Sequence, residues 1–382
     1  MSEHWLADRT RTFDASGIRK VFDLGAKLPD PINLSIGQPD FDVPGPVKDA
    51  AIEAIRQGRN RYTVTQGIPE LHQALRKWLA AEKGLDPEAL LITSGVSGAL
   101  MLAFLVTINP GDEVIIPDPY FVMYKHLVNL CGGKPVFVDT YPDFAVTAER
   151  LKPHLTRKTR LILLNTPANP TGAVIPQKEL ARIAALAKER GALLVSDEIY
   201  DLFTYGESVR SIGALYPNTL VMGGFSKSHA MTGWRVGYAA GPKEIVQEMT
   251  KLQQFSFVCA PSFAQFAALK AFETDTHGFC DAYRRKRDTI YDGLRRAGYQ
   301  VQQPGGAFYI FPKVPWGSDH EFVAEAIRNE LLIIPGSVFS EKATHVRISY
   351  AASDETIARG LKVLHRLIEQ GPPENRGLRT EN

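Results

Sequence analysis

The feature that most constrains the fold of this 382-residue chain is a series of seven short β-rich runs between residues 90 and 240. Most of them are apolar throughout, which is typical of strands buried on both faces of a largely parallel sheet. Segments with helical spacing, such as SGALMLAFLVTI and QKELARIAALAKER, lie between them. The pattern predicts an α/β fold with a mostly parallel sheet between helices. The seven runs are LLIT (90–93), EVIIP (113–117), PVFVD (135–139), RLILLN (160–165), ALLVS (192–196), TLVMGG (219–224) and RVGYAA (235–240).

The C-terminal third follows a different pattern. A long charged helix is expected at HGFCDAYRRKRDTIYDGLRRAG. It is followed by the segment VQQPGGAFYIFPKV, a helix near EFVAEAIRNE, the segment HVRISYA and a last helix at DETIARGLKVLHRLIEQ. The proline-rich segment KLPDPINLSIGQPDFDVPGP near the N-terminus has no long periodic element, so it could pack as an arm on this part or on a partner subunit. We predict a large domain at 50–285 and a smaller, discontinuous α+β domain formed by 1–49 and 286–382.

Composition excludes several classes of function. The 44 Lys and Arg residues nearly balance the 42 Asp and Glu residues, which argues against a nucleic-acid partner. The three cysteines are far apart, and neither they nor the histidines show metal-ligand spacing, so we expect no zinc site, no disulfide framework and a reducing, cytoplasmic location. No stretch approaches about 18 consecutive apolar residues, so we expect neither a membrane span nor a secretion signal.

Polar residues follow several of the predicted strands, where ligands bind in α/β sheets. The turn Gly95-Val96-Ser97 opens a helix and would suit a phosphate, although such a turn is usually only a helix cap. Asn169 lies in the turn NPTG, which could be purely structural. Asp197 ends a buried strand and needs a cation or strong donor, which a structural Arg or Lys could supply as well as a cofactor nitrogen.

Lys227 and Arg235 follow another strand end. A lone lysine in a loop is usually solvated, but Phe225, Met231 and Trp234 flank Lys227 and favour partial burial with a lowered pKa. An amine, a carboxylate and a phosphate-binding turn with an arginine, all at strand ends of one sheet, match the needs of pyridoxal 5'-phosphate.

Four motifs, NPTG, SDEIY, SKSHAMTGWRVGY and GGAFY, occur in this order. With them the chain resembles, from SIGQPDFDVP to HVRISYA, the class I/II aminotransferases of the fold type I pyridoxal-phosphate enzymes, in the aspartate-aminotransferase-like branch. The resemblance implies a large domain with a mostly parallel seven-stranded sheet and a smaller α+β domain. It also implies transfer of the amino group of an L-amino acid to a 2-oxo acid, with 2-oxoglutarate expected, by a ping-pong aldimine/ketimine mechanism.

The same resemblance assigns roles at the cofactor ring. Lys227 resembles the lysine that forms the Schiff base and then moves the proton, and Asp197 resembles the carboxylate that pairs with the pyridinium nitrogen. Tyr200 and Asn169 resemble the two donors to the phenolate oxygen of the cofactor, and Phe121 resembles the aromatic residue that stacks on the ring.

The phosphate site implied by the resemblance comprises Gly95, Val96, Ser97, Ser226 and Arg235. Two positions depart from the family pattern. Many relatives have a serine three residues before the lysine, where this chain has Gly224, and Val96 is bulkier than the usual small residue. Both departures bear on the phosphate contacts and not on the identity of the cofactor.

Substrate and partner expectations come from the resemblance as well. Arg347 resembles the arginine that binds the substrate carboxylate, while Asn169 and Gly37 resemble residues that border the substrate. Tyr62 resembles a tyrosine that reaches the phosphate of the other subunit, which implies a homodimer with shared active sites. In the family the peptide bonds before Pro119 and Pro170 tend to be cis.

Other readings use the same residues. A pyridoxal-phosphate C–S β-lyase or an aminocyclopropane-carboxylate-synthase-like enzyme would need the same site, and a ligand-sensing regulator or a structural protein are further alternatives. Relatives specialised for aspartate often have a lysine near the phosphate turn, where this chain has Val96-Ser97-Gly98. This difference favours neutral or aromatic amino acids as substrates.

Overall fold

The computed structural model describes residues 5–13, 17–18, 21, 25 and 28–373, and all seven predicted strands occur in one sheet. The sheet order is β2-β8-β7-β6-β5-β3-β4, and only β8 runs antiparallel to its neighbours. The predicted α/β fold with a mostly parallel seven-stranded sheet is therefore confirmed. The strands are β2 (Ala89–Thr93), β3 (Glu113–Asp118), β4 (Lys134–Asp139), β5 (Thr159–Asn165), β6 (Leu193–Asp197), β7 (Thr219–Gly224) and β8 (Gly237–Gly241).

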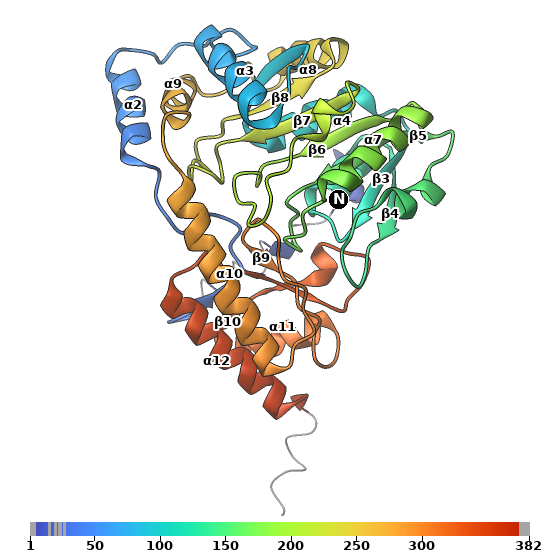
Figure 1. Ribbon diagram of the computed structural model, residues 1–382, viewed down its shortest axis with the longest axis vertical. Helices are drawn as coiled ribbons and strands as arrows, with labels where there is room; N and C mark the ends of the chain where they lie inside the picture. Colours follow the sequence, from blue (N-terminus) through green and yellow to red (C-terminus); the bar gives the residue numbers. More distant parts are fainter. Residues whose placement is uncertain (1–4, 14–16, 19–20, 22–24, 26–27, 374–382) are drawn as a thin grey trace, which may run out of the picture.

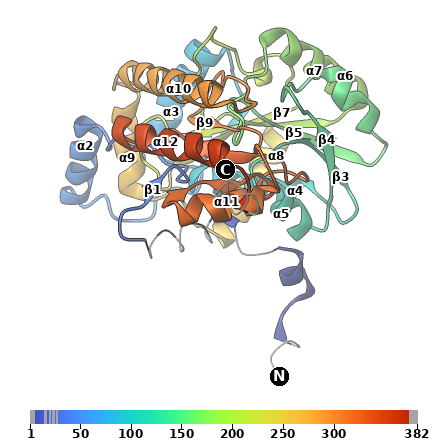
Figure 2. The ribbon, with the colours of Figure 1, turned by 90° about the horizontal axis from the view of Figure 1, so that it is seen from below.

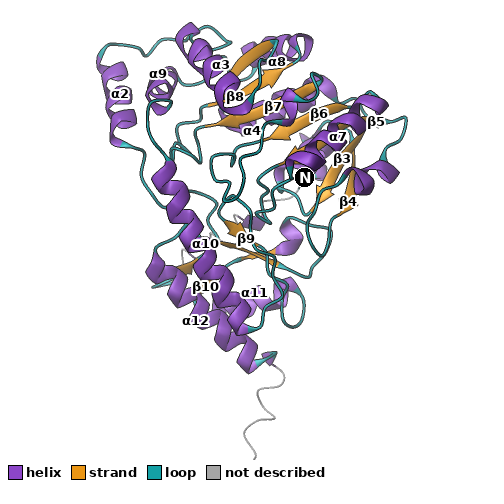
Figure 3. Cartoon of the chain, in the orientation of Figure 1, coloured by secondary structure: helices purple, strands orange, loops and turns teal. Residues whose placement is uncertain are grey.

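Both faces of the sheet are buried under helices (Figure 3). In β5, Leu161 and Leu163 belong to one apolar core, while Ile162 and Leu164 belong to another on the opposite face. This two-sided burial explains why the strand runs are apolar throughout. The helices α4 (Gly95–Thr107), α5 (Met123–Leu130) and α8 (Lys243–Phe255) cover one face, and α2 (Gly45–Arg56), α3 (Pro69–Lys83), α6 (Ala148–Leu151), α7 (Gln177–Arg190) and α9 (Ser262–Ala271) cover the other.

A smaller lobe lies below the sheet in Figure 1, where α10 and α12 run side by side. The predicted boundary at residue 285 falls inside α10, a continuous helix, and the division into two domains stays a prediction. The lobe comprises α10 (His277–Ala297), α11 (Asp319–Arg328), α12 (Asp354–Gln370) and the short strands β1 (Ile32–Asn33), β9 (Tyr309–Ile310), β10 (Leu331–Leu332), β11 (Ile334–Pro335) and β12 (Val346–Ser349). The remaining elements are the 3-10 turns η2 (Asp8–Thr12), η3 (Lys152–His154), η4 (Ile212–Ala214) and η5 (Gly336–Val338).

The N-terminal segment projects from the body of the protein in Figure 2. Trp5 and Leu6 in this segment are exposed. Within the described residues, no helix has the length and apolar character needed to cross a membrane.

One predicted strand begins two residues later than expected. The run RVGYAA was predicted as a strand from Arg235, but β8 begins at Gly237. Arg235 has a left-handed backbone with φ of 54°, which cannot continue a β ladder. The prediction was wrong at this end because an apolar pattern does not reveal a residue whose backbone turns to aim its side chain elsewhere.

Candidate active site

A cavity of about 290 Å³ lies at the carboxyl ends of the central strands. It is lined by every predicted site residue except Gly95 and Tyr62. The pairing register explains this convergence, because Asn165 at the end of β5 lies opposite Asp197 at the end of β6, and Gly224 at the end of β7 lies opposite Gly237. The lining residues are Ile18, Gly37, Val96, Ser97, Leu100, Phe121, Tyr124, Asn165, Asn169, Asp197, Ile199, Tyr200, Ser226, Lys227, Thr232, Arg235, Tyr309 and Arg347.

Lys227 projects into this cavity from the loop after β7. Its Nζ donates a hydrogen bond to the carbonyl oxygen of Gly37 at 2.6 Å. Burial, together with the guanidinium groups of Arg347 and Arg235, lowers the pKa of Lys227 to about 8. A substantial fraction of the amine is therefore neutral near pH 7–8, as a nucleophile or general base requires.

Asp197 ends β6 and is only 3% exposed. Its Oδ2 accepts a hydrogen bond from the Tyr124 hydroxyl at 2.7 Å, and its Oδ1 accepts one from the Ile199 backbone at 3.2 Å. Burial raises the pKa of Asp197 to about 6, an effect that the Tyr124 hydrogen bond opposes. Tyr124 was not predicted as a site residue, and its only sequence signal was its place in PDPYFVMY, where an apolar helix face explains it equally well.

Because the pKa of Asp197 is raised, the stability of the cofactor-free protein should depend on pH. Between the ordinary value of 3.8 and about 6 the folded protein binds more protons at this site than the unfolded chain, so stability falls as pH rises through that window. The free energy of unfolding of wild type minus that of Asp197→Asn should fall by about 2 kcal/mol from pH 4 to pH 6.5, at about 1.4 kcal/mol per pKa unit. Urea titrations of both cofactor-free proteins measure this difference. A flat or rising difference would contradict the prediction.

The turn that carries Asp197 and Tyr200 has an unexpected ion cluster on its other side. Lys83, at the end of α3, contacts Glu198 Oε2 at 2.7 Å and Asp201 Oδ2 at 2.5 Å. Lys83 and Glu198 are buried, and the Ser196 and Ser211 hydroxyls donate to Glu198 Oε1. The turn therefore presents two side chains to the cavity and holds two carboxylates on a buried lysine behind it.

The first turn of α4 and Arg235 lie close together beside the cavity. Gly95 has φ of 66°, and a Cβ at this position would lie 2.7 Å from Arg235 Nη2, so only glycine allows this approach. Arg235 donates to the carbonyl oxygens of Thr232 at 2.9 Å and Ser94 at 3.3 Å. Helix N–H groups with an arginine, Ser97 and Ser226 form a cradle of the kind that binds phosphate.

The departure at Gly224 has a steric explanation. A Cβ on Gly224 would lie 2.9 Å from the Cα of Gly237 on the neighbouring strand. A serine here would require β7 and β8 to move apart, so the hydroxyl that many relatives place at this position has no room in this chain.

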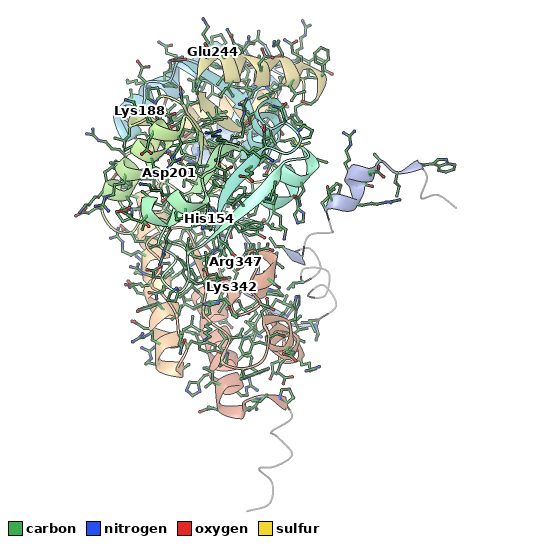
Figure 4. The ribbon with its side chains drawn as sticks, turned by 90° about the vertical axis from the view of Figure 1, so that its right-hand side faces the viewer. His154, Lys188, Asp201, Glu244, Lys342 and Arg347 are labelled. Atoms are coloured by element: carbon green, nitrogen blue, oxygen red, sulfur yellow. The ribbon has the colours of Figure 1, made fainter. Side chains whose placement is uncertain are left out.

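Arg347, on β12, lies at the upper end of the smaller lobe (Figure 4). It lines the cavity and is 1% exposed. Its Nη1 donates to Asn169 Oδ1 at 3.0 Å and its Nη2 donates to the Ser35 carbonyl at 2.8 Å. The Nε atom is buried and has no hydrogen-bond partner among the described residues. A buried guanidinium with an unsatisfied donor beside a cavity is suited to a carboxylate ligand.

Arg347 also contacts two aromatic rings. Its Cζ lies 4.4 Å from the ring centre of Phe339 and 4.6 Å from that of Tyr309. Tyr309, which lines the cavity, was not predicted as a site residue, although the motif GGAFY that contains it was noted.

Tyr62 lies outside the cavity of its own chain, between α2 and α3, and is 82% exposed. The peptide bonds before Pro119 and Pro170 are cis, as predicted. No group of three His, Cys, Asp or Glu residues that could hold a metal occurs within the described ranges. His229 is buried and hydrogen-bonded to Ser228 Oγ at 2.8 Å and the Ala271 carbonyl at 2.9 Å, which is a packing role.

Comparisons with known proteins agree with this geometry. Residues 29–364 match the family described as aminotransferase class I and II. The chain is 41% identical to a probable N-acetyl-LL-diaminopimelate aminotransferase of Bacillus subtilis, over 96% of this chain and 96% of that protein. It is 35% identical to aromatic-amino-acid aminotransferase 2 of Thermococcus litoralis, over 96% and 98%. The solved structure of Thermus thermophilus aspartate aminotransferase with maleate superposes with a TM-score of 0.91 at 36% identity, covering 95% of this chain and 99% of that one.

Proposed function

The chain belongs to the class I and II aminotransferases, and on that premise we propose that it binds pyridoxal 5'-phosphate and moves the amino group of an L-amino acid to 2-oxoglutarate. Enzymes of this family generally depend on pyridoxal phosphate. The observation that carries the proposal is the meeting of Lys227, Asp197 and Arg347 in one cavity.

The cavity residues fit this cofactor. The glycine cradle beside Arg235 suits the phosphate, the buried Asp197 suits a protonated ring nitrogen, and Lys227 supplies the amine. Asn169 turns its Oδ1 toward Arg347, which leaves its Nδ2 to donate to the phenolate oxygen together with the Tyr200 hydroxyl. The unsatisfied Nε of Arg347 suits the substrate carboxylate.

In the proposed mechanism the protein residues bind the substrate and move one proton. Once bound, pyridoxal phosphate supplies an electron-withdrawing ring that stabilises negative charge at the substrate Cα. Lys227 Nζ accepts the Cα proton, since its lowered pKa of about 8 leaves neutral amine available. Arg347 binds the carboxylate in both half-reactions of a ping-pong cycle, because the amino acid and the 2-oxo acid each carry a carboxylate on the reacting carbon.

We also propose that the enzyme is a homodimer with shared active sites. Tyr62, Val64 and Phe255 are all strongly exposed, and Gln253 holds the Tyr62 loop against the end of α8 by donating to the Thr65 carbonyl at 2.8 Å. This exposed apolar group lies on adjacent segments and suits a second copy of the chain. Sedimentation equilibrium tests the proposal, and a monomer at micromolar concentration would contradict it.

The substrate class follows from the charges in the cavity. The cations among the described lining residues are Lys227, Arg235 and Arg347, and the roles above use all three. The described lining residues include no further cation for a second carboxylate, which favours neutral or aromatic amino acids as donors.

Amino transfer to 2-oxoglutarate should be measured with phenylalanine, leucine, methionine and aspartate as donors. We expect glutamate formation, with a neutral or aromatic donor at least as fast as aspartate, because Arg347 is the one cation among the described lining residues that the proposed roles leave for a substrate carboxylate. A hundredfold preference for aspartate would contradict the substrate class. Release of pyruvate or ammonia without glutamate would instead support the alternative, a β-lyase that uses the same residues.

A further inference from the structure

A pair of buried tyrosines joins the two lobes at the cavity. The hydroxyl of Tyr309, on β9, lies 2.9 Å from the hydroxyl of Tyr200, and both residues line the cavity. Tyr309 is 1% exposed and its ring stands almost perpendicular to that of Tyr200, at 82°. A Cβ on Gly37 would lie 2.6 Å from the Tyr309 hydroxyl, so this group occupies a closely defined position.

The direction of this hydrogen bond follows from the number of protons available. A tyrosine hydroxyl has one proton to donate and can accept from another donor. Under the proposed function, on which this inference rests, Tyr200 donates its proton to the phenolate oxygen of the cofactor. The proton between the two tyrosines must then come from Tyr309, which donates to Tyr200.

We propose that Tyr309 is a positioning residue that acts through Tyr200 and Arg347. By donating to the Tyr200 oxygen, Tyr309 fixes the direction of the Tyr200 O–H bond and polarises it, because consecutive hydrogen bonds strengthen one another. The face of the same ring lies 4.6 Å from the Arg347 guanidinium and supports it from one side. Tyr309 thus contacts both Tyr200, which is proposed to donate to the cofactor, and Arg347, which is proposed to bind the substrate carboxylate.

A buried tyrosine needs a hydrogen-bond partner wherever it lies, so pairing alone would not distinguish a positioning role from packing. The chain itself provides the comparison. Tyr350, just after β12, is fully buried and pairs with Tyr205 at 3.3 Å and with the Ala307 carbonyl at 3.1 Å. It does not line the cavity, so it is a matched control for removing one buried hydroxyl from the same lobe.

The experiment is a spectroscopic pH titration of the holoenzyme of wild type, Tyr309→Phe, Tyr350→Phe, Tyr200→Phe and the Tyr200→Phe/Tyr309→Phe double variant. Stronger donation to the phenolate oxygen lowers the pH at which the visible band of the Lys227-bound cofactor changes. Tyr309→Phe should therefore raise this midpoint by about half a pH unit or more, in the same direction as Tyr200→Phe. In the Tyr200→Phe background, Tyr309→Phe should not shift the midpoint further, because the hydroxyl oxygen to which Tyr309 donates is absent.

The inference is overturned if Tyr309→Phe leaves the midpoint unchanged, if Tyr350→Phe shifts it equally, or if the two shifts at positions 200 and 309 add. Wild type without a pH-dependent visible band, even after addition of pyridoxal phosphate, would overturn the proposed function and this inference with it. The wild-type spectrum alone therefore distinguishes a failure of the proposed function from a failure of the inference about Tyr309.

Discussion

Replacing Lys227 by alanine is expected to lower kcat/KM for amino transfer by roughly 10⁴-fold or more, because the change removes both the nucleophile and the proton acceptor. Lys227 is the only lysine among the described residues that line the cavity, so no neighbouring amine is available to replace it. Its Nζ already contacts the Gly37 carbonyl at 2.6 Å, beside the space proposed for the substrate.

The measurement combines steady-state kinetics with covalent trapping. Borohydride reduction of the wild-type holoenzyme should attach the cofactor to the peptide that contains Lys227, and Lys227→Ala should lose both this attachment and the visible band of the imine. Lys188→Ala, an exposed substitution on α7, serves as the control and should retain wild-type activity. A Lys227→Ala enzyme within tenfold of wild type would refute the assigned role.

The sequence predicted the sheet well because its signal is local. Each strand buried on both faces is an apolar run, and each run could be recognised without knowing its neighbours. Site residues near the large sheet could be predicted for the same reason, since Asp197 comes directly after one such run and Lys227 lies three residues after the end of another. Gly95 and Arg235 were also noted from their places at strand ends, but their left-handed backbones, which leave no mark in the apolar pattern, were not predicted.

Contacts between distant segments could not be predicted in this way. Tyr309 and Tyr200 lie 109 positions apart, and Lys83 and Glu198 lie 115 apart. Nothing in the local pattern around Lys83 distinguishes it from a solvated residue at the end of an amphipathic helix. The contact of Tyr124 with Asp197 could not be predicted for the same reason, because a buried position on a helix is enough to explain an aromatic residue there.

Replacing Lys83 by methionine is expected to destabilise the cofactor-free protein by about 3–5 kcal/mol, because it leaves Glu198 buried without a cation. The side chains of Lys83 and Glu198 are each 6% exposed, so water cannot replace the lost partner without local opening. Methionine has a similar length and an apolar end, so the change tests the charge more than the volume. Urea titrations at one protein concentration measure the effect.

Two further variants separate the loss of charge from a general effect of removing a lysine. Lys270→Met breaks an ion pair with Glu273 whose side chains are 46% and 65% exposed, and it should change the free energy of unfolding by less than about 1 kcal/mol. Glu198→Gln added to Lys83→Met should recover part of the loss, because a neutral amide no longer needs the cation and can still accept from Ser196 and Ser211. If Lys83→Met costs no more than Lys270→Met, or if the second change deepens the loss, the buried lysine does not hold the turn behind Asp197 and Tyr200 through its charge.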